Sequence, residues 1–208
     1  MKTRAAQQPR SKDGVGPSSV ALPAGTWPTI IDFLCAHFPA IPFAEWQARM
    51  DRGDVIDASG RALTVDSAYQ PHSKIYYYRS LPAEPRIPFD EVVLYQDDYL
   101  LVVDKPHFLP VTPAGRYLQE TLLVRLKRSL GIDTLAPMHR IDRETAGLVL
   151  FTIQPQTRNL YQTLFRERSV SKEYEAIAPL SDTLDLPTIY RSRLVESDAF
   201  MLSLIHIS

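Results

Sequence analysis

Apolar residues at helical spacing predict two short helices near the start of the chain. The first follows Thr29, whose hydroxyl suits a helix N-cap, and ends before Pro39. The second ends before Gly53, a residue type that is common at helix C-termini. Their apolar faces consist of Ile30, Ile31, Leu34 and Phe38 in the first helix and of Phe43, Trp46 and Met50 in the second.

Two short extended runs over residues 54–66 surround a turn at residues 58–60, a pattern that predicts a β-hairpin. Together these elements predict a small folded unit over residues 28–80. Residues 1–25 contain few apolar side chains, so we expect them to be a disordered arm. Prolines at positions 82, 85 and 88 predict a stiff connector, and a second domain is expected over residues 88–201.

The second half of the chain alternates between apolar runs and helical stripes. The predicted elements are a strand at 99–104, a helix at 118–130, a strand at 147–152, a helix at 160–165 and a strand at 170–178. Pro106 ends the first strand because it lacks a backbone donor, and Gly131 ends the first helix. The last strand is predicted from the alternation of its side chains.

Composition is that of an ordinary globular protein. The chain has 208 residues, of which 45% are apolar and 23% charged, and no apolar run reaches the ~18–20 residues that a membrane span requires. Its single cysteine, Cys35, excludes an intrachain disulfide and a cysteine zinc cage, which fits a reducing cytosol. Although the formal net charge is −1, residues 105–174 hold 11 Lys and Arg against six Asp and Glu. This local excess indicates either a polyanionic partner or scattered solvated charges.

The densest group of reactive side chains is the loop at residues 139–145, directly before a predicted strand. Asp142 lies between two arginines in sequence, Arg140 and Arg143, which favour its ionised form. An ionised carboxylate can act as a nucleophile or a general base, and arginines suit phosphate groups. The alternative is a set of surface ion pairs. A kinase catalytic loop is excluded, since an isoleucine precedes the aspartate and the partner motifs are missing.

Three motifs in this half resemble those of the RluA-type pseudouridine synthases. Residues 139–151, HRIDRETAGLVLF, resemble the signature H-R-L-D-x-x-T-S-G followed by an apolar strand. Residues 100–113, LLVVDKPHFLPVTP, resemble the upstream strand and turn, V-V-x-K-P-x-G-x-x-V-H-P. Residues 165–177, FRERSVSKEYEAI, resemble the later stretch F-x-x-R-x-V-x-K-x-Y-x-A. The motifs stand in the family order, and the resemblance covers residues 92–180.

The chain departs from these patterns at a few positions. Ile141 replaces leucine and Ala146 replaces serine, both of which are small changes. His107 and Phe108 stand where Ala-Gly is usual, and Thr112 where histidine is common. These last differences lie outside the loop of Asp142, and we expect them to affect the turn that faces RNA.

The resemblance implies an α+β fold with a mixed, mainly antiparallel sheet, and isomerisation of uridine to pseudouridine in structured ribosomal or transfer RNA. It implies that Asp142 is the catalytic carboxylate, that Arg140 enters the RNA where the target nucleotide is flipped out, and that Tyr174 packs against the flipped uracil. Other candidate substrate-binding residues are His139, Arg143 and Lys172. Further candidate phosphate contacts are Lys105, Arg125, Arg128 and Arg166. No metal, nucleotide or redox cofactor is implied, and we expect a cytoplasmic monomer without a membrane partner.

Several alternatives remain at this stage. Tyr174 is also consistent with a core tyrosine, Lys172 with a solvated strand residue, and His139 with a residue that only braces the loop. A non-catalytic RNA-binding protein that keeps the synthase fold is the alternative function. Residues 28–80 more loosely resemble the small RNA-binding alpha-L domain of this family, but four aspartates offset the four cations there, so a spacer is an alternative to RNA binding.

We also expect the chain to end within the family's catalytic domain, because nothing after Leu180 resembles the later family motifs. Residues 202–208 resemble the translation of a transposon-end adapter used in sequencing, and are expected to be non-native. A chain of this extent is expected to be inactive and poorly soluble.

Overall fold

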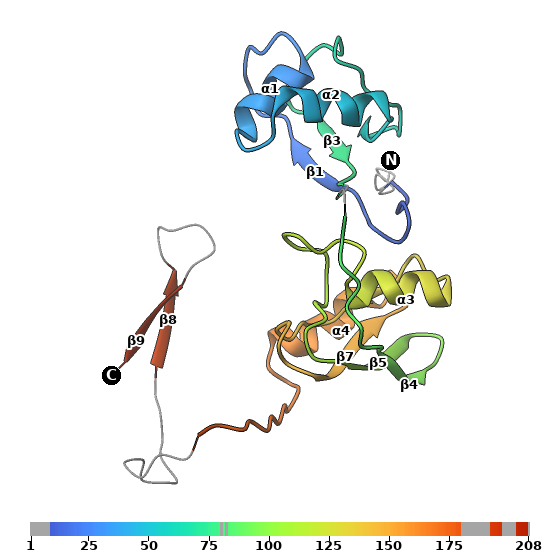
Figure 1. Ribbon diagram of the computed structural model, residues 1–208, viewed down its shortest axis with the longest axis vertical. Helices are drawn as coiled ribbons and strands as arrows, with labels where there is room; N and C mark the ends of the chain where they lie inside the picture. Colours follow the sequence, from blue (N-terminus) through green and yellow to red (C-terminus); the bar gives the residue numbers. More distant parts are fainter. Residues whose placement is uncertain (1–8, 80, 82, 180–191, 197–202, 208) are drawn as a thin grey trace. The chain divides into compact units, whose positions relative to one another are not determined.

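The computed structural model describes residues 9–79, 81, 83–179, 192–196 and 203–207 (Figure 1). The described elements are mixed α and β, and the strand pairs are antiparallel, which confirms the expected α+β class. The chain divides into two compact units, residues 1–170 and 171–208. The predicted catalytic domain at 88–201 spans this division, and the domain boundary at the prolines stays a prediction.

The N-terminal part of the first unit combines a three-stranded sheet with two helices. Its elements are β1 (Ser18–Ala21), α1 (Ile30–His37), α2 (Phe43–Asp51), β2 (Val55–Asp57) and β3 (Lys74–Tyr77). β3 lies in the centre of the sheet, between β1 and β2. The predicted cap of α1 is confirmed: the Thr29 hydroxyl accepts the backbone N–H of Asp32 at 3.3 Å, and the Asp32 carboxylate accepts the N–H of Thr29 at 3.1 Å.

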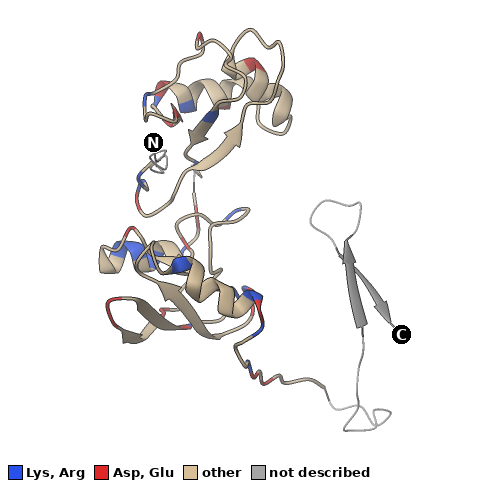
Figure 2. Ribbon diagram, turned by 180° about the vertical axis from the view of Figure 1, so that it is seen from behind, with Lys and Arg blue, Asp and Glu red and all other residues tan. Residues whose placement is uncertain are grey.

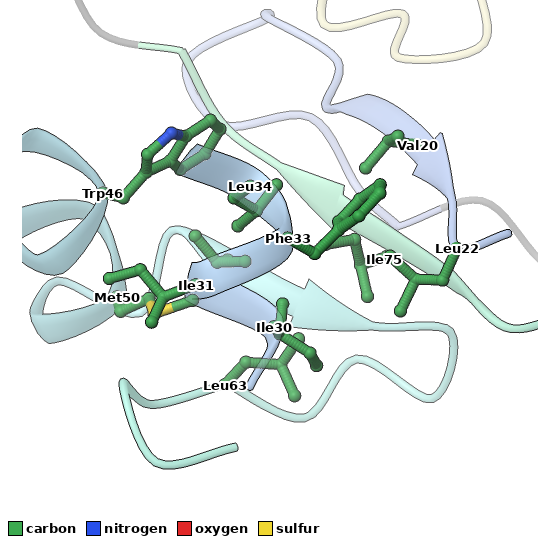
Figure 3. Close-up of a cluster of buried hydrophobic side chains, with 11 residues drawn as sticks. Val20, Leu22, Ile30, Ile31, Phe33, Leu34, Trp46, Met50, Leu63 and Ile75 are labelled. Atoms are coloured by element: carbon green, nitrogen blue, oxygen red, sulfur yellow. The ribbon is translucent and has the colours of Figure 1, made fainter. Parts of the chain in front are cut away.

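The apolar faces of both helices meet the sheet in one buried core (Figure 3). Phe33 and Leu34 of α1 are buried, as is Trp46 of α2, and they pack with Ile75 of β3. The predicted apolar faces are confirmed for Ile30, Ile31 and Leu34 of α1 and for Trp46 and Met50 of α2. Phe43 is 52% exposed, so its prediction is wrong, whereas the buried Phe33 was not predicted.

The predicted disordered arm is wrong for residues 9–25. Val20 of β1 and the neighbouring Leu22 are buried, and β1 pairs with β3. Lys12 forms an ion pair with Asp54 at 2.7 Å. These residues are ordered because β3 offers a free edge, a long-range partner that the polar composition of the arm does not reveal. Residues 1–8 lie outside the described residues.

The predicted hairpin at residues 54–66 is confirmed only around its turn. Asp57 donates its backbone N–H to Arg61 at 2.9 Å, and its carboxylate accepts the N–H of Ser59 at 2.8 Å. The second run makes only an isolated bridge, between Ala62 and Ile56. Over its whole length, β2 pairs with β3 instead.

The second part of the first unit is a four-stranded sheet with a helix packed on its buried face. The elements are β4 (Val92–Gln96), β5 (Leu100–Lys105), α3 (Leu122–Leu130), β6 (Ala136–Pro137), β7 (Gly147–Thr152) and α4 (Arg158–Arg166), in the sheet order β4-β5-β7-β6. The predicted strands at 99–104 and 147–152 are confirmed as β5 and β7. Gly131 caps α3 with φ +69°, as expected for a glycine stop.

The start of α3 lies later than predicted. Leu118 belongs to the preceding turn, where the Glu84 carboxylate accepts the backbone N–H groups of Leu118, Gln119 and Glu120 at 2.8–2.9 Å. In a helix that began at Leu118, the N–H groups of Leu122 and Leu123 would donate to carbonyl oxygens four residues earlier. They donate to Pro110 and Val111 instead, at 2.8 and 3.0 Å, so the helix begins at Leu122.

The strand predicted at residues 170–178 is wrong. The structure describes an irregular, exposed segment there, in which Tyr174 is 60% exposed. Alternating side chains form a strand only where another strand completes the hydrogen-bond ladder, and no described strand pairs with this segment. The second unit contains β8 (Ser192–Glu196) and β9 (Ser203–Ile207), which pair antiparallel.

Candidate active site

Two paired strands position the loop that carries Asp142. Lys105, at the end of β5, lies opposite Gly147, at the start of β7. In the same register, Val103 faces Val149, and both are fully buried. The pairing therefore brings the turn that follows β5 next to the loop that precedes β7.

Lys105 joins this turn to the loop. Its side chain is fully buried, and Nζ donates to the carbonyl oxygens of Pro106, Leu109 and Arg143 at 3.0, 2.8 and 3.2 Å. Burial lowers the pKa of Lys105 to about 8, although the carboxylates of Glu144 and Asp142 act in the opposite direction. The predicted phosphate contact is wrong for Lys105, because its ammonium group is enclosed by backbone carbonyls.

His107 makes a second connection between the same two segments. Its Nδ1 lies 2.7 Å from the carbonyl oxygen of Glu144, a distance that fits an N–H donor. Inside the loop, the backbone N–H of Thr145 donates to the Asp142 carbonyl at 3.2 Å. Three hydrogen bonds, from Lys105, His107 and Thr145, thus fix the backbone around Asp142, while the side chain of Asp142 is exposed.

The arginine that follows Asp142 in sequence pairs with a different carboxylate. Arg143 Nε and Nη2 bind Glu144 Oε1 at 2.8 and 2.6 Å, and Nη1 donates to the Tyr117 hydroxyl at 3.1 Å. The hydrogen bond between Arg143 and Glu144 lowers the pKa of Glu144 and raises that of Arg143. No ion pair among the described residues includes Asp142 or Arg140, and both side chains are exposed. The expected flanking of the Asp142 carboxylate by two guanidinium groups is therefore wrong for both Arg140 and Arg143.

His139, the first residue of the loop, is held by β7 and α4. Its Nε2 accepts the backbone N–H of Leu150 in β7 at 3.3 Å. Its ring stacks on Phe165 of α4, with centroids 4.6 Å apart and planes at 18°. These contacts favour the bracing role over direct binding of substrate.

Tyr174 and Lys172 belong to the second unit. Both side chains are exposed. Their contacts with uracil and phosphate stay predictions, as does the insertion of Arg140 into RNA.

Arg125 has a structural role instead of the predicted phosphate contact. Its side chain is only 10% exposed and pairs with Glu91 at 3.2 Å and with Glu120. It also donates to the carbonyl oxygens of Ile87 and Phe89 at 2.6 and 2.7 Å. Exposed cations remain on α3 and α4, including Arg128 and Arg166, and Figure 2 marks the Lys and Arg residues in blue.

The sequence did not predict that Lys105, His107 and Tyr117 hold the loop. One signal was available for Lys105: it shares the alternation of Leu101 and Val103, which places it on the buried face of β5. The contacts of His107 and Tyr117 depend on long-range packing and left no comparable signal.

Neither a metal site nor a membrane helix is found in the described part of the chain. Its His, Cys, Asp and Glu side chains include no group of three or more that could hold a metal ion. None of its helices is long and apolar enough to cross a membrane.

The fold and the site define a class of protein in which a loop that carries an exposed carboxylate is fixed to a Lys-Pro turn. The turn and the loop lie where the two central strands of an antiparallel sheet, β5 and β7, respectively end and begin. A family model described as RNA pseudouridylate synthase matches residues 99–199. The chain belongs to the RluA-type RNA pseudouridine synthase family.

Two curated relatives agree with this assignment. An uncharacterised RNA pseudouridine synthase of Synechocystis is 33% identical over 150 residues, which cover 71% of this chain and 50% of the relative. The mitochondrial tRNA pseudouridine(32) synthase of Saccharomyces cerevisiae is 37% identical over 84 residues, or 40% of this chain and 18% of the relative. A solved structure of human RNA pseudouridylate synthase domain containing 4 is 32% identical in sequence, with a TM-score of 0.32. The match covers 37% of this chain and 30% of the human chain. The chain spans half or less of the length of these relatives.

Proposed function

We propose that the protein isomerises uridine to pseudouridine in structured RNA, with Asp142 as the catalytic carboxylate. The observation that carries the proposal is the exposed carboxylate of Asp142 on a loop whose backbone is fixed by Lys105 and His107. Catalysis requires a reacting group that is held in place before the substrate binds. The family membership supplies the reaction.

In this reaction the N1–C1′ glycosidic bond breaks and a C5–C1′ bond forms after the uracil rotates. The proton on C5 is released and N1 gains one, so the atoms of the base and sugar balance. A carboxylate next to C1′ can stabilise the cationic sugar or trap it covalently, as in a retaining glycosidase. Attack of Asp142 on the base and removal of a sugar proton are the other possible roles of the same side chain.

Other parts of the proposal concern the RNA. We propose that Arg140 and the exposed cations of α3 and α4 bind its backbone, which predicts that affinity falls steeply with increasing salt. One relative is named for its action on tRNA, which supports transfer RNA as a substrate beside ribosomal RNA.

Mapping of pseudouridines in cellular RNA with and without the gene tests the function and identifies the target. We expect one or a few uridine positions to lose the modification when the gene is deleted. An unchanged map would contradict the proposed activity and would favour the non-catalytic RNA-binding alternative.

A further inference from the structure

Phe108 has an unusual backbone conformation for its residue type. Its φ of +67° lies in the left-handed region, which bulky L-residues rarely adopt. The family pattern has glycine at this position, and glycine adopts such a φ without a steric penalty. Strain of this kind persists only where the surrounding structure enforces it, and it is concentrated at functional sites.

Burial does not account for the phenylalanine. Its side chain is 49% exposed, whereas the next residue, Leu109, is fully buried. The ring makes two loose aromatic contacts, with Phe89 at 6.1 Å and with His107 at 5.9 Å between centroids. About half of the surface of this large aromatic residue is therefore available to another molecule.

The turn that carries Phe108 is fixed to the loop of Asp142. His107, directly before it, bonds to the carbonyl of Glu144 at 2.7 Å. Leu109, directly after it, accepts a hydrogen bond from Lys105, and the same ammonium group binds the carbonyl of Arg143. Phe108 thus lies between two residues that are anchored to the structure around Asp142.

We propose that Phe108 stacks on an unpaired base beside the target uridine, and thereby favours RNA targets in which that neighbouring base is unpaired. The inference rests on the proposed function. Exposed aromatic rings bind single-stranded bases through their π-faces, and the excess of positive charge in residues 105–174 suits the backbone of the same RNA. Because the turn is already fixed before RNA binds, little conformational entropy is lost on binding.

The test compares two RNA stem–loops in a fluorescence anisotropy assay with the full-length protein. One has adenosines on both sides of a loop uridine, and the other has abasic nucleotides in their place. Phe108→Leu is expected to weaken binding of the first RNA by about five- to 150-fold and to leave binding of the second almost unchanged. Phe108→Tyr keeps the ring and is expected to bind like the wild type.

A matched control is Phe43→Leu, because Phe43 of α2 is 52% exposed and lies outside the site. It is expected to bind both RNAs like the wild type. Phe108→Gly suits the positive φ and serves as a second variant if Phe108→Leu does not fold. The proposal would be overturned if Phe108→Leu and Phe108→Gly bound the adenosine RNA as the wild type does, or if none of the three proteins bound it. An equal loss of affinity for both RNAs would also overturn it.

Isomerisation of the uridine is measured separately, by mass spectrometry after selective derivatisation of pseudouridine. A wild-type protein that binds but does not isomerise any RNA would refute the proposed function, while the affinities would still decide the role of Phe108. If the wild type isomerises the uridine and Phe108→Leu binds both RNAs with unaltered affinity, only the role of Phe108 is refuted.

Discussion

The buried lysine at the end of β5 makes the stability of the protein depend on alkaline pH. Lys105 is fully buried and donates to three carbonyl oxygens. Burial lowers its pKa from 10.5 to about 8, so its charged form is less favourable in the folded protein than in the unfolded chain.

The sign and size of the effect follow from proton linkage. Below pH 8 both states hold the proton, and the cost of the buried charge is fully present. Between pH 8 and 10.5 the unfolded chain binds more protons than the folded protein, so the free energy of unfolding rises with pH. The contribution of Lys105 across this window is about 3 kcal/mol, at about 1.4 kcal/mol for each pH unit.

The assay is urea unfolding of the wild type and Lys105→Met at several pH values from 7 to 10.5. Other lysines and tyrosines titrate in both proteins, so the difference between the two free energies of unfolding isolates Lys105. We expect this difference to shift by about 3 kcal/mol in favour of the wild type as the pH rises. Lys74→Met, at an exposed lysine of β3, is the matched control and should show no such trend. A difference for Lys105→Met that stays constant within about 0.5 kcal/mol would refute the reasoning.

Three further substitutions test other parts of the structure by urea unfolding. Arg125→Met leaves the carboxylates of Glu91 and Glu120 without their partner and is expected to lower the free energy of unfolding by about 3–5 kcal/mol. The control Arg128→Met, on the exposed side of α3, should lower it by less than about 0.5 kcal/mol. Similar losses for both variants would contradict the structural role of Arg125. Thr29→Ala removes the cap of α1 and should cost about 1 kcal/mol, and an unchanged midpoint would argue against the capping box. Gly131→Ala places a side chain at φ +69°, so a cost of about 1–2 kcal/mol is expected, and a gain in stability would exclude the left-handed cap.

The parts of the fold that depend on local pattern were predictable from the sequence. The helical spacing of Leu34, Trp46 and Met50 places them in one core, and the apolar runs at 99–104 and 147–152 become β5 and β7. Long-range pairing was not predictable in this way. Residues 18–21 form a strand only because β3 offers an edge, and residues 170–178 alternate without forming one.

The same distinction holds within the candidate site. The motif at residues 139–145 identified the loop and Asp142, but adjacency in sequence did not identify the ion pairs. Arg143 pairs with Glu144, and Lys105 is enclosed by carbonyl oxygens. Side-chain partners depend on how the turn after β5 packs against the loop, which the linear order of charges does not specify.

The central claim is that the carboxylate of Asp142 carries out the isomerisation, and complementation of a gene deletion tests it most directly. Cells that express the full-length wild type, Asp142→Asn or the exposed control Glu167→Gln are compared for pseudouridine at the position that the deletion leaves unmodified. The RNA affinities of the purified proteins are measured alongside. We predict that the wild type and Glu167→Gln restore the modification, and that Asp142→Asn binds RNA normally but restores none. Restoration of pseudouridine by Asp142→Asn would contradict the account.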